Sequence, residues 1–223
     1  MMKYTAVVVG ATGLVGKFLV QELIEDPQCE KIRVIVRRKS FEHPKIEECI
    51  IDFTREDDYL GQVKGDVLFS CLGTTLRQAG SRENQFVVDY TYQFRAAQCG
   101  AQNGITHYVL VSSPFALLKS NNYYRRMKAQ LEESVKALGF DKTVILQPNG
   151  LMGKRDKSRK AEEIAALFFT PLIRAIPSLR KYTPIHGSLV ARAMRLSYLN
   201  SLKSDSRILV LNRNEVMLAA QGK

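Results

Sequence analysis

Short apolar runs recur along the chain and are separated by polar or amphipathic segments. They predict strands at residues 4–9, 32–36, 47–51, 67–71, 107–111, 143–146 and 208–211. Apolar residues at helical spacing predict helices that begin near residues 14, 57, 85, 123 and 188. Strands that alternate with helices indicate an α/β protein with a Rossmann-like doubly wound parallel sheet and helices on both faces.

A long helix is predicted over residues 85–103, and Gly104 follows it at a position that suits a C-cap. The preceding segment, 76–84, is polar and predicts a surface loop. Apolar residues that recur at helical spacing predict the buried face of the helix, and we assign no chemistry to them: Phe86, Tyr90, Phe94, Ala97 and Ala101.

The 223 residues, 45% of them hydrophobic, suffice for one domain with a substantial core. We expect residues 1–223 to form a single domain in which residues 148–187 make a small C-terminal substrate or lid region. Within that region, residues 161–176 predict a helix that Pro171 kinks or divides. Its apolar residues either line a substrate pocket or form an oligomer face: Leu167, Phe168, Phe169, Leu172 and Ile173.

The first strand runs into a turn with three glycines spaced three apart, V-V-V-G-A-T-G-L-V-G. In such a turn Gly10 permits the bend, Gly13 lets backbone approach a pyrophosphate, and Gly16 permits close packing of helix against strand. The following helix would direct its free N–H groups at the phosphates. The turn therefore predicts dinucleotide binding by Gly10, Thr12, Gly13, Leu14, Val15 and Gly16.

Basic residues follow the second strand, where Arg37, Arg38 and Lys39 are consecutive. In such folds this strand end lies beside the adenosine ribose of the ligand. An acidic residue there would accept hydrogen bonds from the ribose of NAD, whereas a guanidinium can pair with a 2′-phosphate. Arg37 and Arg38 therefore predict NADP(H) as the cofactor, and the alternative is a charged surface loop.

The ends of the fourth and sixth predicted strands should meet the same ligand, because ligands lie at the carboxyl ends of parallel strands. The fourth strand breaks at a glycine, which permits close approach to the adenosine ribose and phosphates, and at a threonine that could donate a hydrogen bond. A proline sets the turn after the sixth strand, which should pass the nicotinamide. These turns add as candidate contacts Leu72, Gly73, Thr74, Pro148 and Gly150.

Tyr124 and Lys128 are four residues apart and therefore lie one turn apart on the same face of a predicted helix. A nearby ammonium stabilises the phenolate form of a tyrosine, which favours proton transfer. Tyr124 could then exchange a proton with a substrate hydroxyl while Lys128 also holds the nicotinamide ribose. Ser113, at the preceding strand end, is the preferred ligand of the substrate oxygen. Ser112 is the alternative and is also a candidate cofactor contact.

Lysine and arginine exceed aspartate and glutamate by 33 to 22, which gives a net charge of +11. The excess favours an anionic ligand, but it is spread along the chain without a nucleic-acid motif, so we expect no nucleic-acid partner. The basic run at 154–160 is interpreted as a solvated loop, and the alternative is that it attracts an anionic substrate. No apolar stretch approaches the roughly 20 residues of a membrane span, so we expect no membrane association.

The four cysteines are widely separated and show no metal-ligand spacing, so no metal site is predicted. We interpret them as four unpaired thiols, most of them buried. Such usage is typical of a reducing compartment, and the N-terminus shows no signal-peptide pattern. Together these observations predict a cytoplasmic location.

Several of these motifs together resemble the atypical short-chain dehydrogenase/reductases of the Tat-interacting-protein type. They are the glycine turn, Arg37-Arg38, Asp52-Phe53, C-L-G-T-T at 71–75, Lys-Ser at 119–120 and Y-x-x-x-K at 124–128. The resemblance spans about residues 4–200 and implies a Rossmann domain with a small C-terminal addition and NADPH as the ligand. It adds Asp52 and Phe53 as candidate cofactor contacts. An aspartate at this strand end faces the adenine amino group in such reductases, although it could equally cap the next turn.

Two functions fit this pattern. The first is an NADPH-dependent reductase or dehydrogenase of a small carbonyl or hydroxyl compound, with Ser113, Tyr124 and Lys128 as catalytic residues. The second is a non-catalytic NADPH-binding regulator in which the cofactor orders residues 154–176 for a protein partner. Members of the resembled family are described both as oxidoreductases and as regulatory proteins. A protein partner or a homodimer is an expectation that either function allows.

Overall fold

The computed structural model describes residues 3–153 and 183–222 of the chain. Parallel strands form a seven-stranded sheet in the order β3-β2-β1-β4-β5-β6-β9. Their bounds are β1 Tyr4–Val9, β2 Cys29–Val36, β3 Ile46–Ile50, β4 Val67–Ser70, β5 His107–Val111, β6 Lys142–Gln147 and β9 Ile208–Asn212. The predicted doubly wound parallel sheet is confirmed. The strand order reverses between β1 and β4, which is where such sheets bind ligands.

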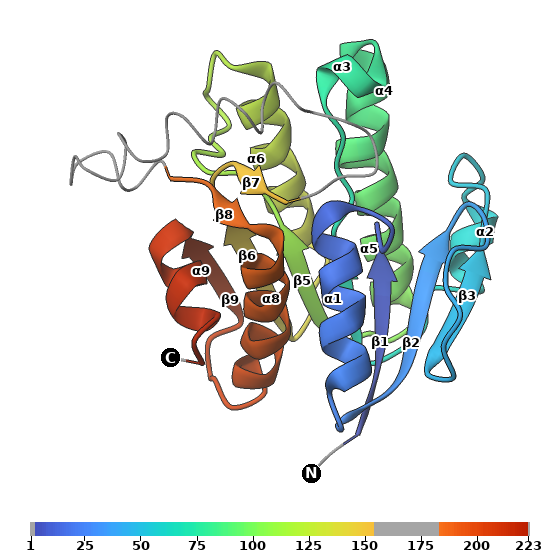
Figure 1. Cartoon of the computed structure of the whole chain (residues 1–223). Helices are drawn as coiled ribbons and strands as arrows, with labels where there is room; N and C mark the ends of the chain where they lie inside the picture. Colours follow the sequence, from blue (N-terminus) through green and yellow to red (C-terminus); the bar gives the residue numbers. More distant parts are fainter. Residues whose placement is uncertain (1–2, 154–182, 223) are drawn as a thin grey trace.

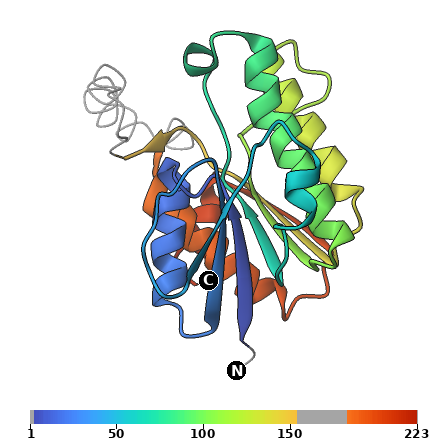
Figure 2. The same ribbon diagram turned by 90° about the vertical axis from the view of Figure 1, so that its right-hand side faces the viewer.

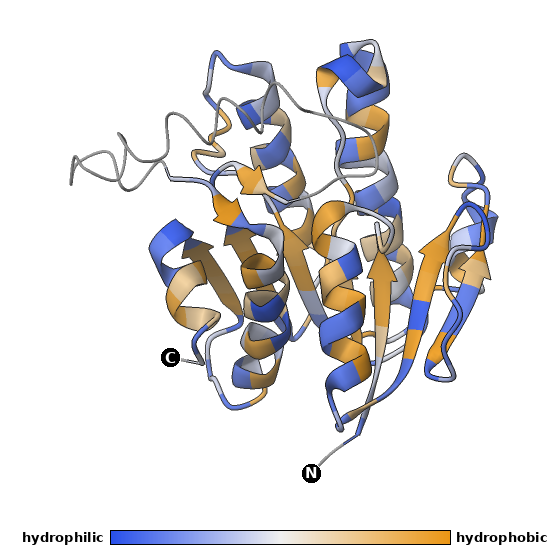
Figure 3. Ribbon diagram, viewed as in Figure 1, coloured by the Kyte–Doolittle hydropathy of each residue, from blue (hydrophilic) through white to orange (hydrophobic). Residues whose placement is uncertain are grey.

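Helices cover both faces of the sheet, as the two views in Figures 1 and 2 show. One face carries α1 (Leu14–Glu25), α8 (Gly187–Ser201) and α9 (Arg213–Ala219). The other carries α2 (Asp57–Leu60), α5 (Tyr92–Gln102) and α6 (Tyr123–Lys136). Figure 3 shows the strands as mostly apolar, as expected for a sheet that is buried on both faces. A separate hydrophobic core therefore fills each side of the sheet.

A second, two-stranded parallel sheet joins β7 (Leu151–Met152) to β8 (Ile185–His186). It connects the turn after β6 with the start of α8. The predicted helix at 161–176, its apolar residues and the basic run at 154–160 all lie outside the described residues.

The polar segment at 76–84 is not a loop, so that prediction is wrong. It contains two short helices, α3 (Leu76–Ala79) and α4 (Arg82–Phe86). Each begins at a hydroxyl that caps it, because the Thr75 side chain accepts from the N–H of Gln78 and the Ser81 side chain accepts from the N–H of Asn84. These local hydrogen bonds stabilise helical turns that have no apolar spacing.

The helix predicted over 85–103 is interrupted by a wider turn. α4 leads into the π-helical segment η1 (Val87–Thr91), and α5 follows it. The N–H of Tyr92 donates to the carbonyl of Val87, five residues earlier, which is the hydrogen bond of a π-helix. One extra residue is therefore accommodated in this turn.

The buried face of this helix differs from the predicted one. Among the expected core residues only Ala97 is buried, while Phe86, Tyr90 and Phe94 are half-buried and stack in a row with ring centroids 4.7 and 5.8 Å apart. The buried positions from α4 to the first turn of α5 are polar: Gln85, Asp89 and Gln93. A polar stripe that faces the interior requires hydrogen-bonding partners there.

All four cysteines are free thiols, as predicted; Cys71 is partly exposed and the other three are buried.

No helix in the described ranges combines the length and the hydropathy that a bilayer span requires.

Candidate active site

A cavity of about 600 Å³ opens at the carboxyl ends of the central strands. Its lining comes from the start of α1, the turns after β4, β5 and β6, the segment η1, and the first half of α6. The structure brings most of the predicted residues to this cavity: Thr12, Gly13, Leu14, Val15, Leu72, Gly73, Thr74, Ser112, Ser113, Tyr124, Lys128, Pro148 and Gly150.

Gly10 and Gly16 shape the glycine turn from behind the cavity lining. Gly10 has φ of +78°, and a Cβ there would lie 2.6 Å from backbone atoms of Cys71 and Leu72. A Cβ on Gly16 would lie 2.1 Å from the carbonyl oxygen of Gly10. The bend and the close packing of α1 therefore exclude any side chain at these two positions.

Gly13 differs from its two neighbours because it is exposed at the cavity. A Cβ on Gly13 would meet its nearest atom, the Gly10 carbonyl oxygen, at 3.2 Å. Gly13 is also the N-cap of α1, and no side chain caps the helix. The amide donors of the first turn, at Leu14 and Val15, border the cavity. This end of the cavity therefore suits a phosphate group.

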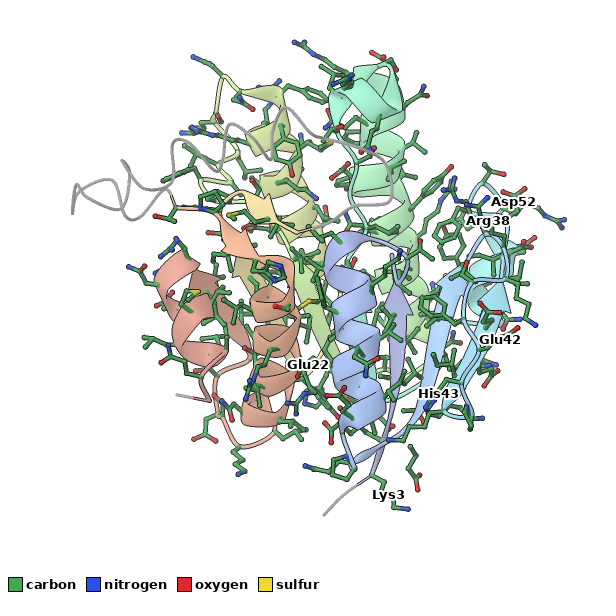
Figure 4. All side chains as sticks on the ribbon, viewed as in Figure 1. Lys3, Glu22, Arg38, Glu42, His43 and Asp52 are labelled. Carbon is green, nitrogen blue, oxygen red and sulfur yellow. The ribbon has the colours of Figure 1, made fainter. Side chains whose placement is uncertain are left out.

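Arg37 and Arg38 follow β2 and are exposed. They do not belong to the lining of the cavity, and neither do Asp52 and Phe53 after β3. Figure 4 shows Arg38 and Asp52 at the same corner of the molecule, beyond the ends of the two strands. The four residues follow the neighbouring strands β2 and β3 and lie outside the cavity lining.

Asp52 caps a turn. Its Oδ1 accepts from the backbone N–H of Thr54 at 2.9 Å and from the Thr54 hydroxyl at 2.7 Å. These hydrogen bonds hold the pKa of the Asp52 carboxyl below its ordinary value. The geometry agrees with the capping alternative for Asp52. Phe53 is buried and packs its ring against Tyr59 and Tyr92.

Tyr124 and Lys128 lie on α6, which begins where the Asn122 side chain accepts from the N–H of Arg125. Both side chains line the cavity, and Lys128 Nζ lies 5.8 Å from the centroid of the Tyr124 ring. Lys128 is only 2% exposed. The predicted spacing therefore places an ammonium beside the phenol inside the cavity.

The two serines after β5 have different surroundings. The Ser112 hydroxyl donates to Glu132 Oε1, and Gln147 Nε2 donates to both oxygens of the same carboxylate at 3.0 Å. Ser113 has no hydrogen-bond partner within the described part of the chain, and it lines the cavity. The geometry favours Ser113 over Ser112 as the ligand of a substrate oxygen.

Asp89 is a buried charged residue of the cavity that the sequence analysis did not select. It lies in η1, lines the cavity, and is fully buried. Its Oδ1 lies 2.9 Å from Lys128 Nζ. The one sequence signal was an acidic residue between Val88 and Tyr90, inside a stretch whose apolar spacing indicated a core helix.

Comparisons with known proteins agree with this geometry. The model of an NAD(P)H-binding family matches residues 10–167. Protein fmp52, mitochondrial, of Emericella nidulans is 34% identical over 205 residues, which cover 88% of this chain and 88% of that protein. Protein HTATIP2 of Rattus norvegicus is 34% identical over 178 residues, which cover 77% and 73%. A structure of MoeE5 in complex with UDP-glucuronic acid and NAD superposes with a TM-score of 0.69 at 19% identity, covering 93% of this chain and 75% of that one.

The parallel sheet, the glycine turn and the cavity define a fold like that of the short-chain dehydrogenase/reductases. The chain belongs to an NAD(P)H-binding family. Within that class the chain belongs to the atypical group that contains Protein HTATIP2 and the fmp52 proteins, so the predicted resemblance to the Tat-interacting-protein type is confirmed.

The predicted cytoplasmic location is wrong. Three fungal relatives of the fmp52 type are named as mitochondrial proteins. The prediction rested on unpaired cysteines, which distinguish reducing from oxidising compartments but do not distinguish one reducing compartment from another.

Proposed function

We propose that the protein is an NADPH-dependent oxidoreductase that interconverts a small carbonyl compound and its alcohol. The observation that carries the proposal is that Ser113, Tyr124 and Lys128 line the same cavity as the glycine turn. A cofactor cradle and a proton-transfer pair in one cavity are the two parts that such a reaction needs.

The described residues fit a dinucleotide. Glycine at position 13 leaves room at the start of α1, where the amides of Leu14 and Val15 would hold the pyrophosphate. Leu72, Gly73 and Thr74 would contact the adenosine ribose and phosphates, and Pro148 and Gly150 would border the nicotinamide. When bound, the reduced cofactor supplies a hydride.

The chain's own residues would handle the oxygen and the proton. Ser113 would donate a hydrogen bond to the carbonyl oxygen, and Tyr124 would donate its phenolic proton to the same oxygen. The Lys128 ammonium, beside the ring of Tyr124, stabilises negative charge that develops on the phenol oxygen.

The preference for NADPH over NADH is supported by Arg37 and Arg38. They are exposed at the end of β2, and the chain has no acidic residue at these positions that would accept from a ribose hydroxyl.

We also infer a mitochondrial location from the names of the fmp52 relatives. Fractionation of cells that express the tagged chain tests that inference.

The test compares two neighbouring tyrosines. Tyr124→Phe removes the phenol beside Lys128 and should abolish turnover across a panel of carbonyl compounds while NADPH affinity stays nearly intact. Tyr123→Phe is the matched control, because the Tyr123 hydroxyl donates to the carbonyl of Arg82 at 2.9 Å and lies outside the cavity lining. The control should retain turnover.

A wild-type protein that binds NADPH but turns over no carbonyl compound would refute the oxidoreductase and favour the regulatory alternative. That outcome would be strengthened if a protein partner bound more tightly in the presence of NADPH. Equal turnover in Tyr124→Phe and the wild type would refute the assigned role of Tyr124.

A further inference from the structure

Asp89 is anchored through its backbone as well as its side chain. The Gln93 side chain donates to the carbonyl oxygen of Asp89 at 2.7 Å and accepts from the Ser70 hydroxyl at 2.7 Å. Ser70 is the last residue of β4, and all three residues are fully buried. The π-helical turn is thereby fixed to the end of a central strand.

The Asp89 carboxylate makes contacts to two separate elements. Oδ2 accepts from the backbone N–H of Thr74 at 2.8 Å, in the turn after β4. Oδ1 pairs with Lys128 Nζ, on α6, at 2.9 Å. One carboxylate thus joins a predicted cofactor-binding turn to the predicted catalytic lysine.

The Lys128–Asp89 ion pair is buried away from solvent, so the charges around it determine whether the lysine stays protonated. The side chains of Lys128 and Asp89 are 3% and 1% exposed. Burial by itself lowers the pKa of Lys128, but the charges of Asp89 from η1 and of Tyr124 and Glu132 from α6 outweigh it, so the pKa lies above its ordinary value. The turn after β4 contributes only the neutral amide of Thr74. Asp89 is therefore the carboxylate in direct contact that keeps the lysine charged.

We propose that Asp89 is a positioning residue of the reaction centre, whose carboxylate holds Lys128 charged and aimed into the cavity while it fixes the Thr74 turn. The inference rests on the proposed oxidoreductase function for the reaction that Lys128 serves. A buried ammonium without its carboxylate would lose its proton or move toward solvent. Either change would remove the positive charge from beside Tyr124.

The test uses Asp89→Asn, which keeps an acceptor for Thr74 and removes the charge. The Lys128 ammonium is titrated by NMR in the chain without cofactor and assigned with Lys128→Arg. We expect the pKa of Lys128 to fall by roughly 1–3 units in Asp89→Asn and to stay unchanged in Asp205→Asn, an exposed aspartate between α8 and β9. An unchanged pKa of Lys128 in Asp89→Asn would overturn the proposal.

Kinetics give a second readout that a merely structural role would not produce. Asp89→Asn should lower kcat at neutral pH by roughly tenfold or more, with a smaller change in the KM for NADPH, and should shift the pH profile of kcat. An equal loss of kcat and of folded protein, with an unshifted pH profile, would overturn the positioning role.

If Asp89→Asn is too unstable for titration, Asp89→Asn combined with Lys128→Met provides the test. Removing both charges of a buried pair costs less than removing one. Recovery of the folded state in the double variant supports the pairing, and no recovery overturns it. If Lys128 titrates as expected but the wild type neither binds NADPH nor turns over carbonyl compounds, the positioning stands and the proposed function fails.

Discussion

The hydroxyl of Ser112, just beyond β5, donates to the carboxylate of Glu132, one helical turn beyond Lys128 on α6. Gln147, at the end of β6, donates to the same carboxylate. Both Ser112 and Glu132 are buried. These hydrogen bonds tie α6 to two strand ends and occupy the Ser112 hydroxyl, which leaves the Ser113 hydroxyl for the proposed contact with a substrate oxygen.

Glu132 should make stability depend on pH. Burial raises the pKa of its carboxyl, although the hydrogen bonds from Ser112 and Gln147 oppose the shift. The folded protein therefore holds the proton more tightly than the unfolded chain, and stability falls as pH rises from about 4.3 through the folded-state pKa. Glu132→Gln removes this titration, so its free energy of unfolding should improve relative to wild type as the pH rises above about 4.3.

Urea denaturation at several pH values measures this difference. Glu133→Gln is the matched control, because Glu133 is exposed and pairs with Lys136 at 2.7 Å. Parallel pH curves for Glu132→Gln and the wild type would contradict the prediction.

The glycine turn predicts a separation of stability from binding. Gly16→Ala forces a Cβ against backbone at 2.1 Å and should destabilise the fold by about 1–3 kcal/mol or more. Gly13→Ala meets only one close atom, at 3.2 Å, and should cost little stability while it weakens NADPH binding. Thermal denaturation and NADPH titration of both variants distinguish the packing role of Gly16 from the binding role of Gly13. Equal losses of stability in the two variants would argue against this distinction.

Cofactor preference can be tested at Arg37. Arg37→Ala should weaken NADPH by roughly 10–100-fold and NADH much less, because a charged hydrogen bond to a phosphate is lost. Lys39→Ala is the control, since Lys39 is exposed and lies 3.3 Å from Glu42. Calorimetric titration with both cofactors measures the ratio. The same loss for NADPH and NADH would refute the 2′-phosphate assignment.

Arg195 links two helices on the face opposite α5 and α6. From α8, its Nε lies 3.1 Å from Glu22 on α1, and its terminal nitrogen lies 3.4 Å from the buried carboxylate of Asp26. Arg195→Ala should lower the free energy of unfolding by about 2 kcal/mol, whereas Arg192→Ala, exposed on the same helix, should change it little. Chemical denaturation measures the free energy of unfolding of the two variants. Similar free energies for both would show that the ion pairs of Arg195 contribute nothing measurable to stability.

The strands could be predicted from the sequence because an apolar run that is buried on both faces leaves a direct signal. The run at 4–9 coincides with β1, and the run at 107–111 coincides with β5. Elements that local hydrogen bonds stabilise were missed. The helix α9 starts with a capping box between Asn212 and Glu215, a spacing that the sequence shows but that apolar periodicity does not detect.

The placement of candidate residues was predictable where a local pattern fixes the geometry, as at Gly10 in the glycine turn or in the four-residue spacing of Tyr124 and Lys128. Asp89 was not, because its role depends on partners far along the chain. Thr74 is 15 residues away and Lys128 is 39 residues away, and only the folded sheet brings them together. In addition, regular helical spacing predicted that Phe86, Tyr90 and Phe94 face the interior, whereas Asp89 is the residue that is fully buried.

The π-helical turn at 87–91 amounts to one amino acid added to an otherwise ordinary helix. Removing a single codon there would restore the common ladder and rotate the preceding segment by about 100° relative to α5. Gln85 would then turn from the buried face toward the direction in which Phe86 now lies. A chain shortened by one residue in this turn could therefore not present an acid to the lysine in the same way.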